Sequence, residues 1–384
     1  MIRLRPISVR SSIDGGICFF VLQLAGTYEF PFTQTTVETP SMKNVLRASV
    51  FCLLLSLCAF AAFAADAPQT FKVAYNPQTG NILGFIALEK GYDAEENIKI
   101  ELVPFSNSTD ALNALQSGKV DVAVSFGTTA PLTFVTKGAD FTIYGGYVSG
   151  GMPVYARPDF EYKGMQSFVG HSVAVPRMYT PEIVWRGAMA KAGLDPNSQC
   201  TVLEFKKPTE VLEAVKSGKV DVGIGTNSTY LQAVAAGLKI VTWTNDLDPM
   251  HVCCRPVSKT SLLTDNPALV VSFLRAWIKA EHFLITNPED CVPINANYLK
   301  LDEAQARQML LETNQVFESD PKTNGVRYMW KLLGDLNYAQ TGGIDIEKHL
   351  NSALYEKALN SLAAENPNDK VYAMFKERYV KYNK

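Results

Sequence analysis

In one stretch of the chain, apolar residues first recur at helical intervals and then alternate with polar or small residues. Leu112 and Leu115 fit one face of a helix, and Val120–Val124 then alternates as a strand does. An apolar run, Ile100–Phe105, precedes the helix, and Gly118 ends it because glycine readily adopts a positive φ. The pattern predicts a strand–helix–strand unit, in which the two strands are parallel and the crossover is right-handed.

The same pattern returns at a fixed offset of 100 residues. FSNSTDALNALQSGKVDVAV (Phe105–Val124) aligns without a gap on FKKPTEVLEAVKSGKVDVGI (Phe205–Ile224), and SGKVDV is identical in both. Thr109 and Thr209 fall where a helix N-cap is expected. Internal repeats of this length define architecture. Two copies are too few for a solenoid, so the sequence predicts two similar α/β lobes, each built on a parallel sheet.

The remaining pattern indicates how the lobes are connected. Strands are expected at Phe71–Tyr75, Ser172–Val175 and Lys239–Trp243. Glycine- and proline-rich segments predict two crossings between the lobes, near Gly150–Tyr155 and His251–Pro256. The expected division is lobe 1 at 66–152, lobe 2 at 153–249, and a return to lobe 1 with a helical tail at 250–384. In that tail, amphipathic helices are expected at Ala268–Ile285, Asp302–Glu318, Val326–Leu336 and Ile346–Ala364.

The first 65 residues have a different character. Residues 1–41 show no clear period and are interpreted as a non-native or unstructured extension. Residues 42–64 have a positive start, the uncharged run Ala48–Phe60, and the small-x-small site Ala62–Ala64, a pattern typical of a secretory signal peptide. We therefore expect a periplasmic protein cleaved near Ala64/Ala65; a retained membrane anchor is the alternative.

Charge and cysteine content exclude some functions. Five basic and three acidic residues precede Ala65, so the remainder carries a formal net charge of −4 and no basic run, which argues against nucleic acid binding. Cys200, Cys253, Cys254 and Cys291 lie beyond the signal peptide, and their disulfide state is left open. No phosphate loop, nucleophile elbow or zinc-protease helix is present, and no cofactor or metal is expected.

Ligands of parallel sheets bind beyond the carboxyl ends of the strands. Short polar loops follow the expected strands there, and helix N-termini suit anions. Arg177 stands beside such a helix, so a sulfonate, carboxylate or nitrate would fit; a solvated arginine or a pair with Glu182 is the alternative. The candidate ligand-binding residues are Asn76, Thr79, Asn81, Ser125, Gly127, Thr128, Thr129, Arg177, Tyr179, Thr180, Thr226, Asn227, Tyr230 and His251.

Two further features suggest other ligands. Tyr147, Tyr155, Tyr179, Trp185 and Trp243 could stack on a flat heteroaromatic ligand, although core packing is favoured for the two tryptophans. His251, Cys253 and Cys254 resemble metal ligands, but the paired spacing of structural zinc sites is absent. A buried crossover strand is the favoured interpretation of that stretch.

The sequence resembles the solute-binding proteins of ABC transporters in the nitrate, sulfonate, taurine and thiamine-precursor group. The resemblance covers roughly residues 71–287 and rests on the order of its segments, which are GFIALEKGY (84–92), ALNALQSGKVDV (111–122), KGAD (137–140), GHSVAVP (170–176) and AGLDP (192–196). It implies a type II periplasmic-binding fold, with a ligand enclosed between two lobes joined by two crossovers.

The expected function is capture of a small anionic solute of the sulfonate, taurine or nitrate class by hinge closure, without catalysis. The expected partners are that ligand and an ABC permease in the membrane, and the protein is expected to be a monomer. A thiamine-precursor pyrimidine is the alternative ligand. The alternative of another class is a pyrimidine-handling enzyme, because eukaryotic relatives in that branch are enzymes with a cysteine-rich motif. Only the pair Cys253-Cys254 of that motif is present here, which argues against this alternative.

Overall fold

Residues 67–77 and 80–384 are described by a computed structural model. The predicted extension, the signal peptide and Thr79 lie outside these residues. The strands are β1 Gln69–Tyr75, β2 Ile98–Pro104, β3 Val122–Ala123, β4 Phe141–Ile143, β5 Val148–Ser149, β6 Pro153–Ala156, β7 Ser172–Pro176, β8 Thr201–Phe205, β9 Val222–Ile224, β10 Lys239–Trp243, β11 Val257–Lys259 and β12 Val316–Phe317.

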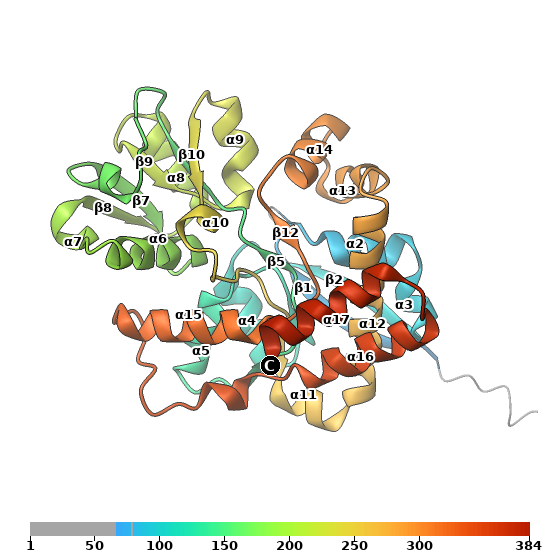
Figure 1. Ribbon diagram of the computed structural model, residues 1–384. Coiled ribbons are helices and arrows are strands. Elements are labelled where there is room, and N and C mark those ends of the chain that lie inside the picture. Colours follow the sequence, from blue (N-terminus) through green and yellow to red (C-terminus); the bar gives the residue numbers. More distant parts are fainter. Residues whose placement is uncertain (1–66, 78–79) are drawn as a thin grey trace, which may run out of the picture. The chain divides into compact units, whose positions relative to one another are not determined.

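Two five-stranded sheets organise the described chain. Lobe 1 contains the sheet β2-β1-β3-β11-β4 and lobe 2 the sheet β10-β6-β9-β7-β8. In each sheet three parallel strands lie side by side, and the next strand is antiparallel and arrives from a crossing between the lobes. That strand is β11 in lobe 1 and β6 in lobe 2. The mixed α/β architecture with parallel-containing sheets confirms the predicted fold class (Figure 1).

The strand pairing repeats the offset seen in the sequence. Val73 pairs with Leu102 and Val122, and Val173 pairs with Val202 and Val222. A register slip of one residue would turn every side chain to the opposite face of the sheet. The shared register therefore shows that the two copies fold into the same unit.

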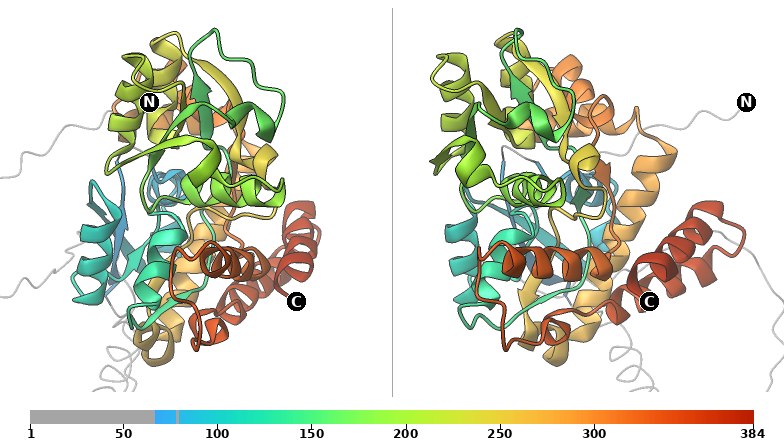
Figure 2. Two further views of the ribbon diagram at one scale, coloured as in Figure 1. Left: turned by 90° about the vertical axis from the view of Figure 1, so that its left-hand side faces the viewer. Right: turned by 60° about the vertical axis from the view of Figure 1, so that its left-hand side comes forward.

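The helices are α2 Ile82–Glu89, α3 Tyr92–Glu95, α4 Ser108–Gln116, α5 Thr129–Val135, α6 Thr180–Lys191, α7 Pro196–Gln199, α8 Pro208–Lys216, α9 Tyr230–Ala235, α10 Thr244–Leu247, α11 Thr260–Asp265, α12 Pro267–Thr286, α13 Cys291–Leu299, α14 Glu303–Leu311, α15 Thr323–Asp335, α16 Ala353–Glu365 and α17 Lys370–Asn383. Short 3₁₀ segments are η1 Met165–Phe168, η2 Asn227–Thr229 and η3 Ile346–His349. Helices α15, α16 and α17 lie beside lobe 1 (Figure 2).

The repeat helices end as predicted but begin earlier. Gly118 and Gly218 both follow the helix at φ 73°. The N-cap positions are Asn107 and Lys207, so the prediction of Thr109 and Thr209 was wrong. The Asn107 side chain accepts from the Asp110 N–H, and Pro208 is a favourable first helical residue.

The tail departs from its predicted pattern in two places. The expected helix Asp302–Glu318 ends at Leu311, and the chain then forms β12, which pairs with β5. Helices α13 and α17 were not predicted. The apolar periodicity of the tail locates the longer helices, but it does not distinguish a two-residue strand from a helix end.

The crossings meet at a small strand cluster between the lobes. Val148 of β5 forms a bridge with Cys254 of the returning chain, and β12 pairs with β5 from its other side. Arg255 is 1% exposed and joins all three segments: its guanidinium donates to the Val148 carbonyl, to the Pro321 carbonyl and to the Glu318 carboxylate at 3.0–3.1 Å. The junction between the lobes therefore contains a third segment in addition to the two predicted crossings.

Aromatic side chains form the centre of each lobe. Phe71 stacks on Phe273 in lobe 1, with ring centroids 4.7 Å apart. Trp185 is fully buried against Phe168 in lobe 2, which confirms its interpretation as a core residue. These buried rings fix the sheets and so the loops at their carboxyl ends.

Candidate functional site

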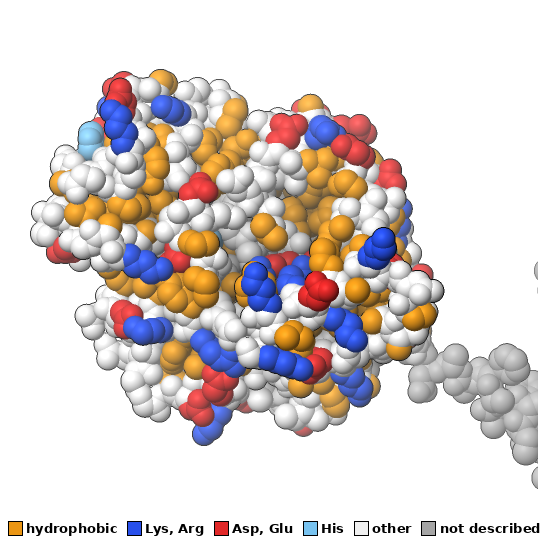
Figure 3. Space-filling model, in the orientation of Figure 1, with side chains coloured by type: hydrophobic (Ala, Val, Ile, Leu, Met, Phe, Trp, Pro, Cys, Tyr) orange, Lys and Arg blue, Asp and Glu red, His pale blue; other side chains and the backbone are white. Residues whose placement is uncertain are grey.

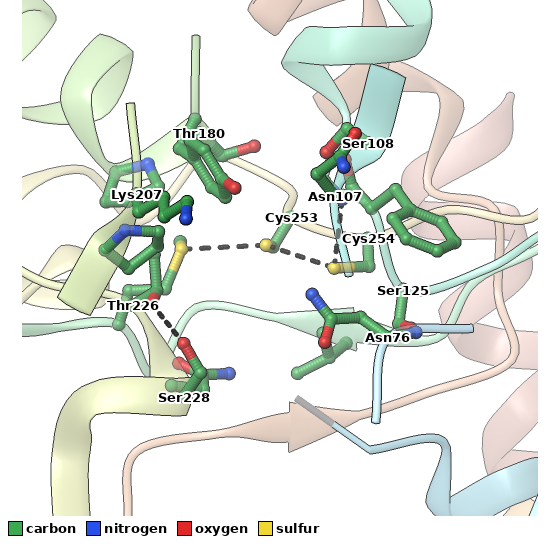
Figure 4. A pocket seen from close by; sticks show the side chains of 18 of the residues that line it. Asn76, Asn107, Ser108, Ser125, Thr180, Lys207, Thr226, Ser228, Cys253 and Cys254 are labelled. Atoms are coloured by element: carbon green, nitrogen blue, oxygen red, sulfur yellow. Dashed lines mark hydrogen bonds between the residues drawn. The ribbon is translucent and has the colours of Figure 1, made fainter. Parts of the chain in front are cut away.

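A cavity of about 320 Å³ lies between the lobes, at the carboxyl ends of both sets of parallel strands (Figure 4). Segments that follow β1, β2 and β3 line it from lobe 1, and segments that follow β7, β8 and β9 line it from lobe 2. The crossing segments form its floor. The lining residues are Asn76, Ser106, Asn107, Ser108, Ser125, Phe126, Gly127, Tyr147, Val148, Met152, Tyr179, Thr180, Pro181, Lys206, Lys207, Pro208, Thr209, Thr226, Asn227, Ser228, Cys253 and Cys254.

The lobe 1 wall consists of small neutral side chains. The Ser125 hydroxyl accepts the Asn76 N–H at 2.8 Å, which ties the ends of β1 and β3 together. Asn107 caps α4, and the Ser108 hydroxyl donates to the Phe126 carbonyl at 3.3 Å. This wall offers hydroxyl and amide groups and no formal charge.

The lobe 2 wall carries two cations. Lys206 and Lys207 follow β8 and are exposed, and neither ammonium group has an ion-pair partner among the described residues. Figure 4 shows Lys207 on the opposite side of the cavity from Asn107 and Ser108. Because none of the lining residues is Asp or Glu, the cavity has an excess of positive charge.

Helix N-termini add to the positive electrostatic potential of the cavity. The first residues of α4, α6 and α8 line the cavity, as does η2. A helix N-terminus is equivalent to roughly half a positive charge and presents free N–H groups. Pro181 and Pro208 lack an N–H, so α6 and α8 each present one free donor fewer than α4 does.

The floor contains three sulfur atoms. The Cys253 and Cys254 sulfurs lie 3.4 Å apart, and the Cys253 sulfur lies 3.6 Å from that of Met152. Their shared hydrogen bond raises the pKa of Cys253 and lowers that of Cys254, to which the Gly127 N–H also donates. All four cysteines of the described chain are free thiols.

The two lobes touch directly beside the cavity. Thr180 at the start of α6 accepts from the Thr128 N–H at 3.2 Å and lies 3.3 Å from the Thr129 hydroxyl. A Cβ on Gly127 would meet the Thr180 hydroxyl at 2.9 Å, so glycine at this position permits the approach. This contact brings the start of α5 onto the start of α6.

The structure brings about half of the sequence-predicted ligand residues together. Those that line the cavity are Asn76, Ser125, Gly127, Tyr179, Thr180, Thr226 and Asn227. Those described residues that do not line it are Asn81, Thr128, Thr129, Arg177, Tyr230 and His251. Ligand contact by any of them stays a prediction.

The residues outside the cavity have other surroundings. Arg177 is 66% exposed and its Nε lies 3.6 Å from the Glu204 carboxylate. His251 is buried against the Asp248 carbonyl, and burial lowers its pKa. Thr128 and Asn81 are fully buried. Tyr230 packs on Trp243, with ring centroids 5.5 Å apart.

Sequence reasoning missed the segments 106–108 and 206–209. The rule that parallel strands direct ligands to their carboxyl ends was applied to the strands that became β1, β3, β7 and β9, but not to β2 and β8. Had it been applied to the strand that precedes each repeat helix, it would have found Lys206 and Lys207.

Comparison with known proteins places this geometry in a family. A family model described as NMT1/THI5 like matches residues 78–291, more than half of the chain. The chain belongs to the NMT1/THI5-like family. This confirms the resemblance to solute-binding proteins seen in the sequence.

Relatives and solved structures agree with this assignment. A formylaminopyrimidine-binding protein of Halalkalibacterium halodurans is 24% identical over 251 residues, 62% of this chain and 73% of the relative. The periplasmic aliphatic sulphonate-binding protein SsuA of Escherichia coli has a TM-score of 0.61 at 16% identity, covering 73% of this chain and 92% of its own. The periplasmic nitrate-binding protein NrtA of Synechocystis PCC 6803 has a TM-score of 0.63 at 17% identity, covering 77% of this chain and 89% of its own. These structures show a shared periplasmic-binding fold.

Within residues 67–77 and 80–384, no helix combines the length and the apolar composition needed to cross a bilayer.

Proposed function

We propose that this NMT1/THI5-like protein captures a small anionic solute between its lobes, as the binding component of an ABC importer in the periplasm. One observation carries the proposal: Lys206 and Lys207 border a cavity that has no acidic lining residue. A cation without an ion-pair partner at the edge of a protein cavity attracts anions, and its hydrogen bonds to an anion are stronger than neutral ones.

Capture would work by closure about the hinge. A solute that contacts Lys207 on one wall and Asn107 or Ser125 on the other touches both lobes only when they are close. A ligand shifts a conformational equilibrium only by its difference in affinity for the two states, so this double contact would favour the closed state. The strand cluster of β5, β12 and Cys254 is where the chain would bend, and the closed form would dock on a permease.

A binding screen tests the proposal. Alkylsulfonates, taurine, nitrate, carboxylates and aminopyrimidines are added to the purified protein, and the melting temperature is recorded. At a ligand concentration one hundred times the Kd, binding adds about 2.7 kcal/mol of stability. We expect a shift with at least one anion, and a tenfold or greater loss of its affinity by calorimetry in Lys207→Gln, because a charge-assisted hydrogen bond contributes roughly 1.5–3 kcal/mol.

Lys216→Gln is the matched control. Lys216 is the last residue of α8, the helix whose first residues line the cavity. It pairs with Glu213, and neither residue lines the cavity, so its substitution should leave ligand affinity unchanged. Equal losses in the two variants, or an absence of any anion among the ligands, would contradict the proposal.

A pyrimidine is the second candidate ligand. Tyr179 and Phe126 line the cavity and offer aromatic faces, and the Halalkalibacterium relative is a formylaminopyrimidine-binding protein. A melting shift with aminopyrimidines alone, unaffected by Lys207→Gln, would favour this candidate. Recovery of the bound pyrimidine in altered form would instead support the enzyme alternative.

A further inference from the structure

A second hollow of about 420 Å³ adjoins the cavity at the mouth of the cleft. One wall is α9 of lobe 2, and the other is formed by α14 and the segment that follows α13. Figure 1 shows α9 opposite α13 and α14, and α9 contacts α14. We call it the α9–α14 groove. Its lining residues are Pro77, Thr209, Asn227, Ser228, Leu231, Gln232, Ala235, Leu299, Leu301, Gln305 and Met309.

The groove continues the ligand cavity. Thr209, Asn227 and Ser228 line both hollows. Thr209 is two residues from Lys207, so the passage between the hollows begins beside the cation. A molecule held by Lys207 could extend into the groove without leaving the cleft.

The chemistry changes along this path. None of the residues that line the groove is charged, whereas the cavity has two lysines. Leu231 on one wall and Leu299 and Leu301 on the other are partly exposed, and Met309 of α14 is a buried part of the second wall. Figure 3 shows the surface hollowed between lobe 2 and the α13–α14 region, with hydrophobic side chains beside the hollow. Partly exposed aliphatic side chains on facing walls gain stability when an apolar group covers them.

Hydrogen bonds hold the two walls at this spacing. The Asn227 amide of lobe 2 donates to Gln315 Oε1 at 2.7 Å, and Gln315 Nε2 donates to the Met309 carbonyl at 3.0 Å. The carbonyl can only accept, so it fixes the orientation of the Gln315 amide, and that amide fixes Asn227. The groove is therefore built from both lobes.

We propose that the ligand is an organic anion with an unbranched apolar tail, whose head lies beside Lys207 and whose tail lies in the α9–α14 groove. This inference rests on the proposed function. A tail in the groove contacts α9 and α14 together, so each buried methylene favours the closed state as well as binding. The groove thus selects tailed anions over inorganic ones.

A homologous series tests the inference. Calorimetry is performed with straight-chain alkanesulfonates from methanesulfonate to octanesulfonate, and with inorganic sulfate and nitrate. Burial of one methylene corresponds to about fourfold in affinity, so we expect Kd to fall by up to about fourfold for each added carbon until the groove is filled. Equal affinity across the series, or tightest binding of an inorganic ion, would overturn the inference and leave anion capture intact.

Two groove variants locate the tail. Leu231→Ser on α9 and Leu301→Ser on the facing wall are each expected to reduce the gain per carbon to twofold or less and to leave methanesulfonate affinity unchanged. Val380→Ser, an exposed aliphatic position on α17 that is 56% accessible, is the control and keeps the full gain. If both variants fold and still gain about fourfold in affinity for each added carbon, the tail does not lie in the α9–α14 groove. Failure of every anion to bind would overturn the proposed function and this inference together.

Discussion

The two lobes share one backbone unit, yet they differ in chemistry at corresponding positions. Ser106, Asn107 and Ser108 stand in lobe 1 where Lys206, Lys207 and Pro208 stand in lobe 2. Both segments follow the equivalent strand, precede the equivalent helix and line the same cavity. The duplication therefore preserved the positions that set strand register, while the positions that face the cavity diverged and placed its positive charge on one wall.

A second difference lies inside the helices that follow β1 and β7. Ile82 and Ile86 of α2 are buried apolar side chains. In α6, by contrast, Glu182 and Arg186 form a buried ion pair at 2.9 Å. Burial raises the pKa of Glu182 even though Arg186 acts to lower it. The first turns of these two helices thus differ: α2 buries apolar side chains, and α6 buries an ion pair.

Among the substitutions that test this comparison, those at the Glu182–Arg186 ion pair should change the free energy of unfolding most. Arg186→Met leaves the Glu182 carboxylate buried without its cation, and removal of one partner of a buried pair costs about 3–5 kcal/mol. The double variant Glu182→Ile with Arg186→Ile introduces the residue type that α2 buries and should recover most of that loss, since apolar replacement of both partners is often neutral. Urea unfolding measures both. A double variant as unstable as the single one would show that Met178 and Tyr338, which also bind Glu182, matter more than the charge.

A smaller effect is expected at the aspartate in each copy of SGKVDV, Asp121 and Asp221. Asp121 accepts one backbone N–H, from Lys72 at 2.7 Å. Asp221 accepts both the N–H and the hydroxyl of Ser172, at 2.9 and 2.8 Å, and also faces His171. With hydrogen bonds to a charged group contributing about 1.5–3 kcal/mol, Asp221→Ala should destabilise by about 2–3 kcal/mol and Asp121→Ala by about 1–2 kcal/mol.

The effect of Asp221 should depend on pH. Burial acts to raise the pKa of its carboxyl, but the hydrogen bonds from Ser172 and His171 outweigh burial and hold that pKa below its ordinary value. A lowered pKa stabilises the fold above the unfolded value, about 3.9, and the contribution is lost as pH falls through the folded value. Denaturation at pH 7 and at pH 3 should therefore show a smaller difference between Asp221→Ala and the parent at pH 3. An equal difference would exclude the charge as the cause.

The smallest effect separates stability from binding. Asn107→Ala removes the side-chain cap of α4, which costs about 1 kcal/mol. Lys207→Ala at the equivalent position should leave the melting temperature of the ligand-free protein unchanged, because Glu210, rather than the lysine side chain, binds the helix start. Ligand affinity should show the opposite order, with the larger loss in Lys207→Ala. Equal stability losses in the two variants would mean that the two helix starts are held in the same way.

These differences explain what the sequence could predict. SGKVDV at the same offset identified the two lobes, because strand register and helix ends depend on a few apolar and glycine positions that repeat. Ligand contact by Arg177 stays a prediction, but its side chain lies beside Glu204 and does not line the cavity. The direction of a long side chain after a turn depends on its tertiary neighbours, and no local pattern encodes them.

The tail was the least predictable part for a similar reason. Val316 and Phe317 form β12 only because β5 presents a partner more than 160 residues earlier in the chain. Apolar periodicity shows which face of an element is buried, and a strand of two residues is too short to show any period. Arg255 was missed as the centre of the junction between the lobes because its partners come from two distant segments, at Val148 and at Glu318–Pro321.

The position of β11 has a consequence for the order of folding. Lobe 2 draws its whole sheet from the continuous segment 153–243, whereas in lobe 1 β11 is inserted between β3 and β4. The first sheet therefore stays incomplete until residues 257–259 return across the intervening lobe. Closing so long a loop is entropically unfavourable, and distant contacts slow folding. We therefore expect lobe 2 to form early and the return of β11 to be the slow step, which completes lobe 1 and at the same moment assembles the floor of the cavity between the lobes.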